Sequence, residues 1–376
     1  MRSQDKVLSS MELQSPNEVK NLNKVYTNHF TYQNEIGLLD IQESFRWKKW
    51  RFNVGGTTQI AQVRLNNKKT IERNFQRNQL LFQPTLAVSV QLSDHQRLMF
   101  FYYGQQSLPS SEQFNEGYIQ SSYRSFSRNV SQFYVTQNNN LQLNYNNTNW
   151  TKLYAFNLGI SHNQNYFVNT SNFAFSELLS FDEQQPIATK LGQWSANCQL
   201  DRLIALLSTK IRFEGFVSQS DILNRVNGSA LLPNYTQNFN GKIYAISAFD
   251  FPLNFQLSTR LNFNRVMNRS DKKEISSAKL FVPSVILKYQ PLPKLTLRLT
   301  GEQLNWYNQQ NRDVTNLLDL DIILHPEKSL WTFSMRGNNL LNTKAIYYTT
   351  VSNYAIFQRN YLLQPRWVSV SANRSF

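Results

Sequence analysis

Residues 330–336 read Leu-Trp-Thr-Phe-Ser-Met-Arg, with apolar and polar side chains in strict alternation. Trp331, Phe333 and Met335 fall on one side of an extended chain, and the polar residues between them fall on the other. Residues 368–376, Val-Ser-Val-Ser-Ala-Asn-Arg-Ser-Phe, repeat this pattern. Because successive side chains of a β-strand point to opposite faces of its sheet, both segments predict strands with one apolar and one polar face.

The last residue, Phe376, places an aromatic ring at the end of such a strand. A soluble sheet can carry the same alternation. In a transmembrane β-barrel, however, the outer face must be apolar, the lumen can be polar, and aromatic girdles lie at both membrane interfaces. We therefore predict an all-β, antiparallel transmembrane β-barrel, with Phe376 in its lower girdle.

Two motifs resemble the TonB-dependent receptor family of outer-membrane barrels, especially its large relatives in Bacteroidetes-type bacteria. The first is Asn-Leu-Leu-Asn at residues 339–342, followed by Pro-Arg at 365–366 and the terminal Phe376. The second is Leu-Pro-Ser-Ser-Glu-Gln-Phe at residues 108–114, which is similar to a motif at the start of a long external loop. Arg374 departs from the family, where an aromatic or apolar residue is usual.

The resemblance implies a location in the outer membrane of a Gram-negative bacterium and no enzymatic activity. Full-length relatives take up scarce nutrients such as siderophores, cobalamin or glycans, using an N-terminal plug domain and energy from the inner membrane. Implied partners are membrane lipid, lipopolysaccharide and the barrel assembly machinery, with TonB engaged only through a plug that we do not find. The resemblance also makes Phe376 the end that guides membrane assembly.

Composition agrees with a barrel and excludes a helical membrane protein. Hydrophobic residues make up 41% of the 376 residues and aromatics 14%. No apolar run approaches the roughly 20 residues that a spanning helix needs. Barrel strands are only half apolar, so this low hydrophobic content suits them.

The formal net charge of +15 raises the alternative of a nucleic-acid-binding protein. The basic residues are dispersed, however, and no helix-turn-helix, zinc-finger or RNP-type motif is present. We therefore expect no nucleic-acid partner. Loops that meet an anionic lipopolysaccharide surface, together with a solvated lumen, account for the charge.

Catalytic and cofactor motifs are missing from the sequence. Cys198 is the single cysteine, and the four histidines are not at metal-ligand spacing to one another. Asp319 and Asp321 share a strand face, which we interpret as lumen hydration rather than a pair of catalytic acids. We predict neither an enzyme nor a cofactor.

Several basic residues fall on the predicted lumen side of their strands. They can attract an anionic solute or an acidic plug surface, or they can simply be hydrated, because barrel interiors are polar. The candidates are Arg260, Arg298 and Arg336, with Lys210 and Arg212 as weaker members.

Alternating segments recur from residue 36 to residue 376 and predict about fifteen strands. Residues 1–35 are polar and predict a loop or the remnant of an extracellular loop. Residues 165–185 fit either a strand extension or a loop. Long connections, the longest at 105–138 and another at 219–234, alternate with short ones, as extracellular loops and periplasmic turns do in bacterial barrels. The short connections are expected at residues 48–49, 93–96, 147–149, 201, 250–252, 291–293 and 326–328.

The odd strand count predicts part of a larger barrel, because single-chain bacterial barrels have even counts. No apolar signal-peptide segment follows the first residues, which suggests that an N-terminal part is missing. Transporters of this type have 22 strands. We therefore expect the sheet to be open or strained, with two unpaired edges.

Two other functions stay open from the sequence. One is a self-sufficient porin-like or structural outer-membrane barrel. The other is a secreted or soluble β-rich binding module, which would not depend on detergent.

Overall fold

The computed structural model describes residues 2–4, 30–67, 74–130, 132–176, 179–308, 312–327, 329–351 and 356–374. In these residues eighteen strands form one sheet and two more form a separate hairpin. Fifteen of the eighteen are long and follow one another around the sheet: β2 (Phe30–Trp47), β3 (Trp50–Asn67), β4 (Phe75–Ser93), β5 (Gln96–Ser107), β8 (Thr136–Asn149), β9 (Tyr154–Phe175), β10 (Ser180–Ile204), β11 (Thr209–Val226), β12 (Leu232–Ser247), β13 (Leu253–Asn268), β14 (Glu274–Leu292), β15 (Leu295–Asn308), β16 (Arg312–Leu324), β17 (Trp331–Asn338) and β20 (Trp367–Arg374).

The remaining elements are short; β1 precedes β2, and the others lie in the connections. They are β1 (Arg2–Gln4), β6 (Ile119–Ser122), β7 (Ser125–Asn129), the hairpin strands β18 (Ala345–Val351) and β19 (Ile356–Leu362), and the 3-10 turns η2 (Ser111–Phe114) and η3 (Ala205–Leu207).

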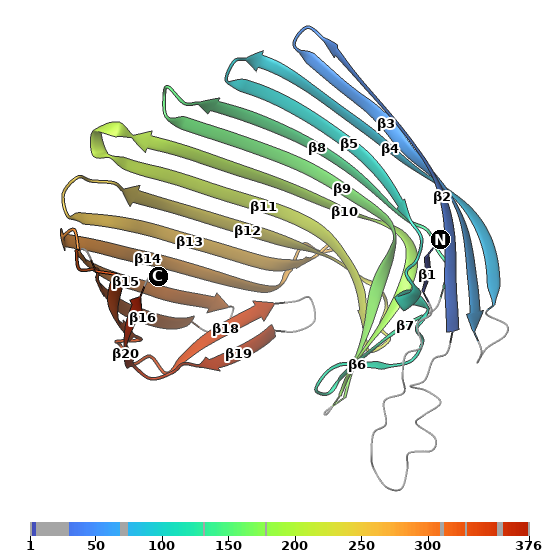
Figure 1. Cartoon of the computed structure of the whole chain (residues 1–376). Helices are drawn as coiled ribbons and strands as arrows, with labels where there is room; N and C mark the ends of the chain where they lie inside the picture. Colours follow the sequence, from blue (N-terminus) through green and yellow to red (C-terminus); the bar gives the residue numbers. More distant parts are fainter. Residues whose placement is uncertain are drawn as a thin grey trace.

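Each long strand pairs antiparallel with the next, so the predicted all-β antiparallel fold of about fifteen strands is confirmed. Figure 1 shows the sheet bent into a deep curve, with β2 and β20 at its two ends. Within the described residues no backbone pairing joins β2 to β20, and β2 has only the three-residue β1 on its other side. The described sheet is therefore open, as expected.

The connections at one end of the strands, which we call the short-turn end, are two to six residues long. At the other end only 108–135 and 339–366 are long, and the remaining connections have three to seven residues, so the predicted alternation of short and long connections is wrong for most of the sheet. The predicted turns at 48–49, 93–96 and 291–293 are at or beside the observed ones, which lie at 48–49, 94–95 and 293–294. Two predicted turns are wrong. The turn after β8 lies at 150–153 rather than 147–149, and the turn after β10 lies at 205–208 rather than at Asp201.

The long connections are shorter than predicted because the strands extend into them. The described residues of 165–185 are strand up to Phe175 and again from Ser180, which resolves the alternatives in favour of a strand extension. Most of the predicted loop 219–234 is also strand. At the N-terminal side, β2 begins at Phe30, before the strand start expected at residue 36.

The two faces of the sheet differ in what covers them. Trp306 of β15 contacts Tyr348 of the β18–β19 hairpin, and Tyr32 of β2 contacts the loop that carries η2. Strand registers place Trp306 and Tyr32 on the same face, and Figure 1 shows both covering segments inside the curve. We call this side the concave face and the other the convex face.

Neighbouring rows of side chains on β14, β15, β16, β17 and β20 show the contrast between the faces. One row, on the convex face, runs Tyr289, Leu297, Ile322, Met335 and Val370. The adjacent row, on the concave face, runs Lys288, Arg298, Asp321, Arg336 and Ser369.

Aromatic side chains gather on the convex face beside the short turns. Phe45 and Phe52 are directly opposite each other on β2 and β3 and stack at 4.8 Å between ring centroids. Trp331 lies under the guanidinium of Arg374, 6.0 Å from the ring centroid. The departure from the family pattern at Arg374 thus sits in a cation–π contact. Phe376 lies outside the described residues.

Candidate functional site

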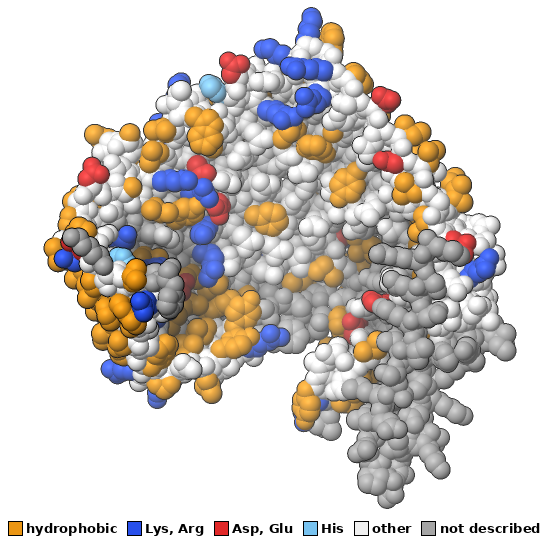
Figure 2. Space-filling model, in the orientation of Figure 1, with side chains coloured by type: hydrophobic (Ala, Val, Ile, Leu, Met, Phe, Trp, Pro, Cys, Tyr) orange, Lys and Arg blue, Asp and Glu red, His pale blue; other side chains and the backbone are white. Residues whose placement is uncertain are grey.

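The concave face is the candidate site, because polar side chains converge there. In Figure 2 its hollow is mostly white, the colour of uncharged polar side chains and backbone, with a band of blue and red across it. Asparagines of β8 and β10 face each other across the glycine of β9: Asn144 and Asn197 are both register partners of Gly159. A Cβ at Gly159 would meet both amide oxygens, so this row of amides packs closely only because the residue between them is glycine.

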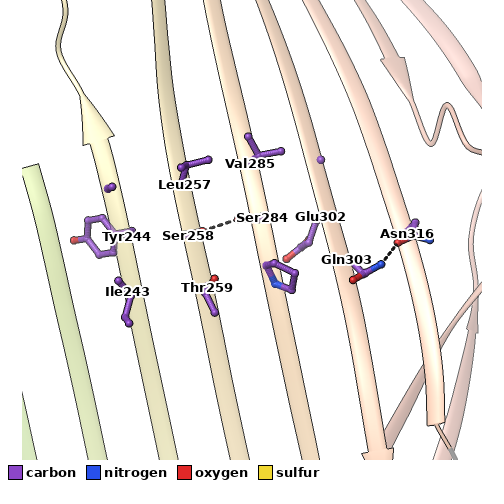
Figure 3. A pocket seen from close by; sticks show the side chains of 13 residues that line it. Ile243, Tyr244, Leu257, Ser258, Thr259, Ser284, Val285, Glu302, Gln303 and Asn316 are labelled. Atoms are coloured by element: carbon purple, nitrogen blue, oxygen red, sulfur yellow. Dashed lines mark hydrogen bonds between the residues drawn. The ribbon is translucent and has the colours of Figure 1, made fainter. Parts of the chain in front are cut away.

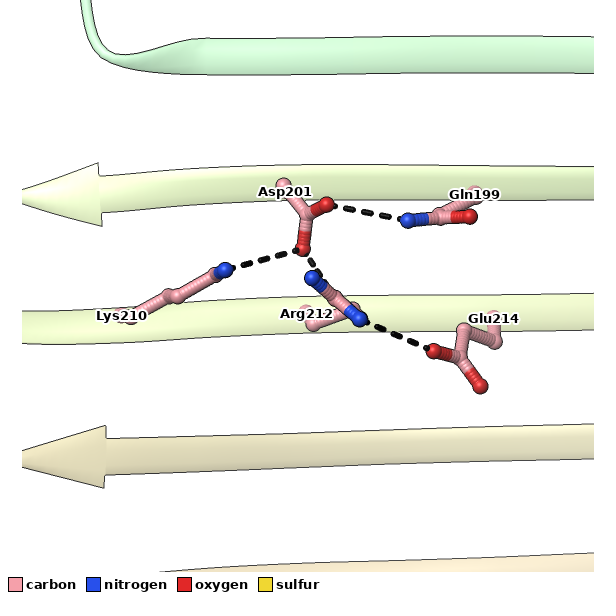
Figure 4. Close-up of polar contacts among 5 residues, drawn as sticks. All are labelled: Gln199, Asp201, Lys210, Arg212 and Glu214. Atoms are coloured by element: carbon pink, nitrogen blue, oxygen red, sulfur yellow. Dashed lines mark hydrogen bonds and ion pairs between the residues drawn. The ribbon is translucent and has the colours of Figure 1, made fainter.

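A charged cluster lies on β10 and β11, on the concave face (Figure 4). Asp201 accepts hydrogen bonds from Arg212 Nε and from Gln199 Nε2, the latter at 3.0 Å. Lys210 Nζ lies 3.9 Å from the same carboxylate, and Arg212 Nη1 lies 3.5 Å from Glu214. Arg212 and Lys210, predicted as weaker candidates, therefore face acidic partners.

Arg260 of β13 lies on the same face as this cluster. Its register partners are Lys242 on β12 and Val282 on β14. Lys242 is in turn the register partner of Glu214 on β11, and its Nζ lies 5.1 Å from the Tyr244 ring centroid. Arg260 thus extends a row in which two cations follow a single carboxylate.

Arg298 and Arg336 are brought together by Asp321. Asp321 is the register partner of both arginines, on β15 and β17. Arg336 Nε donates to Asp321 Oδ1 at 2.6 Å. Asp319, two residues earlier, accepts the backbone N–H of Asn339 at 2.8 Å. The two aspartates therefore serve separate contacts, and Arg260 lies apart from the other two candidate arginines.

The motif at residues 108–114 folds over one end of the concave face. Tyr32 donates its hydroxyl to the carbonyl of Pro109 at 2.8 Å. Phe114 is 1% exposed and packs with Tyr32, Val63 and Leu65, so apolar residues on the concave face are buried there by the loop. A hollow of about 780 Å³ separates this loop from the strands and is lined by amides and by Glu112.

The Asn-Leu-Leu-Asn motif closes the base of the connection that carries the β18–β19 hairpin. Asn339 and Asn342 both adopt left-handed backbone conformations, with φ of 50° and 55°, which asparagine tolerates better than most residues. The Asn339 amide donates to the carbonyls of Thr343 and Gln364, each at 2.8 Å, and the N–H of Arg366 donates to Asn342 at 3.1 Å. The motif thus ties the start of the connection to its end.

A second hollow lies mainly on the convex face, across β12 to β16 (Figure 3). It measures about 650 Å³, and Leu257, Val285 and Ile243 line it beside Gly301, which has no side chain to fill it. Gln303 donates to Asn316 at 2.9 Å in the same wall, where the convex face becomes polar.

In the part of the chain that the structure describes, no three His, Cys, Asp or Glu residues are grouped closely enough to hold a metal ion. The same residues contain no helix with the length and hydropathy needed to span a membrane.

Sequence reasoning missed a basic group on β2, β3 and β5. Arg46 and Arg51 lie one position outside the residues that flank the two-residue turn at 48–49. Arg97 lies two positions after the turn at 94–95. The signal was present: a two-residue turn makes the flanking residues Trp47 and Trp50 opposite partners, and Arg46 and Arg51 the next pair.

Comparisons with known proteins give limited likeness. No protein-family model matches the chain, and no curated protein matches it. LpxR from Salmonella typhimurium is 10% identical, over 64% of this chain and 87% of that chain, with a TM-score of 0.21. The ferric-catecholate import receptor Fiu from E. coli K12, in its open form, is 9% identical, over 92% of this chain and 79% of that chain, with a TM-score of 0.26. Because both TM-scores are low, we infer function from the strand pattern and its contacts.

Proposed function

We propose that this chain forms part of the wall of an outer-membrane transport barrel of the TonB-dependent-receptor type. The observation that carries the proposal is the pair of neighbouring rows on β14 to β20. The convex row ends in Met335 and Val370, which are 43% and 76% exposed, and the concave row holds charged groups. In water the convex row would belong to a large exposed apolar surface, which soluble monomers rarely carry. Facing lipid, the same row is favourable.

The two motifs support the receptor type within this class. Both lie in long connections, and both connections fold toward the concave face at the end away from the short turns. Loops placed there narrow a lumen and contact solutes that enter it. The proposed activity is passage of a polar solute along the concave face, without enzymatic chemistry.

The open edges of β2 and β20 are part of the proposal. Unpaired strand edges are not tolerated in the hydrocarbon region of a bilayer. Further strands are therefore required between β2 and β20, and a 22-stranded barrel of this family would supply them. In that assembly the proposed partners are lipid, lipopolysaccharide, the barrel assembly machinery and, through a plug domain, TonB.

Two measurements on the purified full chain test the proposal. It should need detergent to stay dispersed, and it should show no steady solute conductance of its own in planar bilayers. A chain that stays monomeric without detergent would contradict the membrane location. Steady conductance through the chain alone would instead favour a self-sufficient porin-like barrel.

A further inference from the structure

Two arginines face each other beside the first short turn. Arg46 of β2 and Arg51 of β3 are direct register partners on the concave face. Directly opposed residues in an antiparallel pair have Cβ atoms about 4.5–5.5 Å apart, and like charges there are destabilising. A hydrophilic wall needs only polar side chains at these positions, so two opposed guanidinium groups need another explanation.

A third arginine is directed toward the same place. Arg97 of β5 has Gln91 as its register partner on β4, yet its Nη2 donates to Ser89 Oγ at 3.3 Å. Ser89 is the register partner of Arg51. The guanidinium of Arg97 therefore leans toward Ser89, next to Arg51, and Arg46 lies on the other side of Arg51.

No acid neutralises this group within the described residues. Arg46, Arg51 and Arg97 form no ion pair there, whereas Arg212 and Arg336 on the same face are each bonded to an aspartate. Arg46 Nε reaches only the carbonyl of Lys48, at 3.4 Å.

The arginines line a hollow of about 470 Å³ at the short-turn end of the concave face. Ser89, Asn146 and Thr148 supply neutral hydrogen-bonding groups in its wall, and Lys49 adds a further cation. The charged or titratable residues at its rim also include Asp94 and His95. Cations thus outnumber carboxylates in a hollow of the size of a small-ligand site.

We propose that this hollow binds a small soluble solute that carries a phosphate or a similar multiply charged oxyanion. The planar guanidinium fork matches phosphate oxygens in pairs, and two opposed forks can hold one phosphate group between them. The anion would also remove the repulsion between Arg46 and Arg51. Trp50 and Trp150 also line the hollow. A solute is favoured over a lipid headgroup because the three arginines lie on the concave face, opposite the apolar convex row.

The test is titration of sodium pyrophosphate into the purified full chain in a phospholipid-free, uncharged detergent, followed by calorimetry. We expect saturable binding at one site. Arg51→Gln and Arg97→Gln should each weaken it at least tenfold. Arg202→Gln, which removes one charge from the convex face near the short-turn end of β10, should leave it unchanged.

Thermal unfolding gives a second readout that does not depend on comparing affinities. Pyrophosphate should raise the unfolding midpoint of the wild type, because a ligand that binds only the folded state stabilises it. At the same concentration it should raise that of Arg51→Gln by clearly less. If the variants fail to fold, the wild type still decides: pyrophosphate should protect Arg51 and Arg97 from phenylglyoxal, as mapped by peptide mass.

Several outcomes would overturn the proposal. Non-saturable binding of pyrophosphate would contradict it. So would an Arg202→Gln variant that weakens binding as much as Arg51→Gln, or a failure of pyrophosphate to protect Arg51 and Arg97 from phenylglyoxal. Binding of a poly-glutamate peptide without binding of pyrophosphate would indicate a protein partner instead. Arginine protection by added phosphatidylglycerol but not by pyrophosphate would indicate a lipid headgroup. None of these results bears on detergent dependence or conductance, so the test is separate from that of the transport proposal.

Discussion

Trp306 of β15 and Tyr348 of β18 meet edge to face, with 4.8 Å between their ring centroids and an interplanar angle of 69°. Trp306 is 7% exposed and also packs with Leu280 and Val282. The contact holds the β18–β19 hairpin against the concave face, where β18 touches β13 to β16. Trp306 and Tyr348, which are more than forty positions apart in the sequence, are thus in contact on the concave face.

Replacing Trp306 with alanine should release this hairpin. The change removes an aromatic pair that is worth about 0.5–1.5 kcal/mol beyond the area it buries. We expect trypsin to cleave after Lys344 and Arg359 at least several-fold faster than in the wild type, as followed by mass spectrometry. Unchanged cleavage would show that the hairpin is held by other contacts.

A matched control separates the ring from its N–H group. Among the described residues Trp306 Nε1 has no hydrogen-bond partner, so Trp306→Phe should keep most of the packing and protect the hairpin nearly as well as the wild type. Trp331→Ala, on the convex face, should leave cleavage of the hairpin unchanged.

Spin labels at Leu297 and Arg298 should report different surroundings in a bilayer. The side chains are neighbours in sequence and lie on opposite faces of β15. A label at Leu297 should be quenched by oxygen, which is lipid-soluble, and a label at Arg298 by a water-soluble nickel chelate. Equal access of both quenchers to both sites would contradict the membrane orientation.

Asp321→Asn should destabilise the wall more than Arg336→Gln. The first change leaves Arg298 and Arg336 on either side of an uncharged residue, whereas the second removes only one partner of an exposed ion pair. Exposed pairs are worth about 0–1 kcal/mol. In urea unfolding from detergent micelles we therefore expect a loss of about 1 kcal/mol for Asp321→Asn and less for Arg336→Gln. The reverse order would argue against Asp321 as the shared partner.

Deletion of Phe376 should impair membrane assembly, as measured by the heat-modifiable migration of the folded barrel. The expectation comes from the family resemblance and from the girdle position. Tyr348 is a poor control because its ring packs on Trp306. Tyr123, which is 81% exposed in the turn between β6 and β7, is the better control residue. Normal assembly of the Phe376 deletion would contradict the assignment of an assembly end.

The connection between β7 and β8 should loosen at alkaline pH. Tyr134 lies there, outside the strands, and is 5% exposed with its hydroxyl donated to Asn169 at 2.7 Å. Burial raises the pKa of the Tyr134 hydroxyl above its ordinary value of about 10. Its contribution to stability is therefore complete below that ordinary value and is lost as the pH rises through the folded-state pKa.

The difference in absorbance near 295 nm between the wild type and Tyr134→Phe, followed through a pH titration, measures this group alone. The difference should appear above the range of an exposed tyrosine. Titration within or below that range would show that the side chain is not buried in solution.

Alternation predicted the strands best where one face is apolar. Along β13, β15 and β17 the pattern of the sequence and the faces of the structure coincide. The two wrong turns have a local cause. Asparagine is common in turns, but Asn149 ends β8 and accepts hydrogen bonds from Thr151 and Lys152 of the following turn. Asp201 stays within β10, where it accepts a hydrogen bond from Arg212.

The strand extensions were hidden for a different reason. In residues 165–175, 180–185 and 219–226 apolar residues occur in consecutive runs or singly among polar residues, so no period of two is visible. The charged contacts were equally hidden, because the pairing of Asp201 with Arg212 and of Asp321 with Arg336 depends on register. Only the two-residue turn at 48–49 fixes a register that can be read from sequence, and it identifies Arg46 and Arg51 as partners.

The length of β10 has a mechanical consequence. Its 25 residues extend over roughly 80 Å at about 3.3 Å per residue. At a tilt of about 45° this gives a height near 60 Å, against a hydrocarbon core of about 30 Å. Roughly half of β10 would stand clear of the bilayer, and there residues 180–192 pair with β9 and, at 180–184, with β7 rather than with β11. The connection between β9 and β10 is attached to two paired strands whose register shifts between Ile187 and Lys190. Moving this connection therefore requires bending the two strands or breaking their hydrogen bonds.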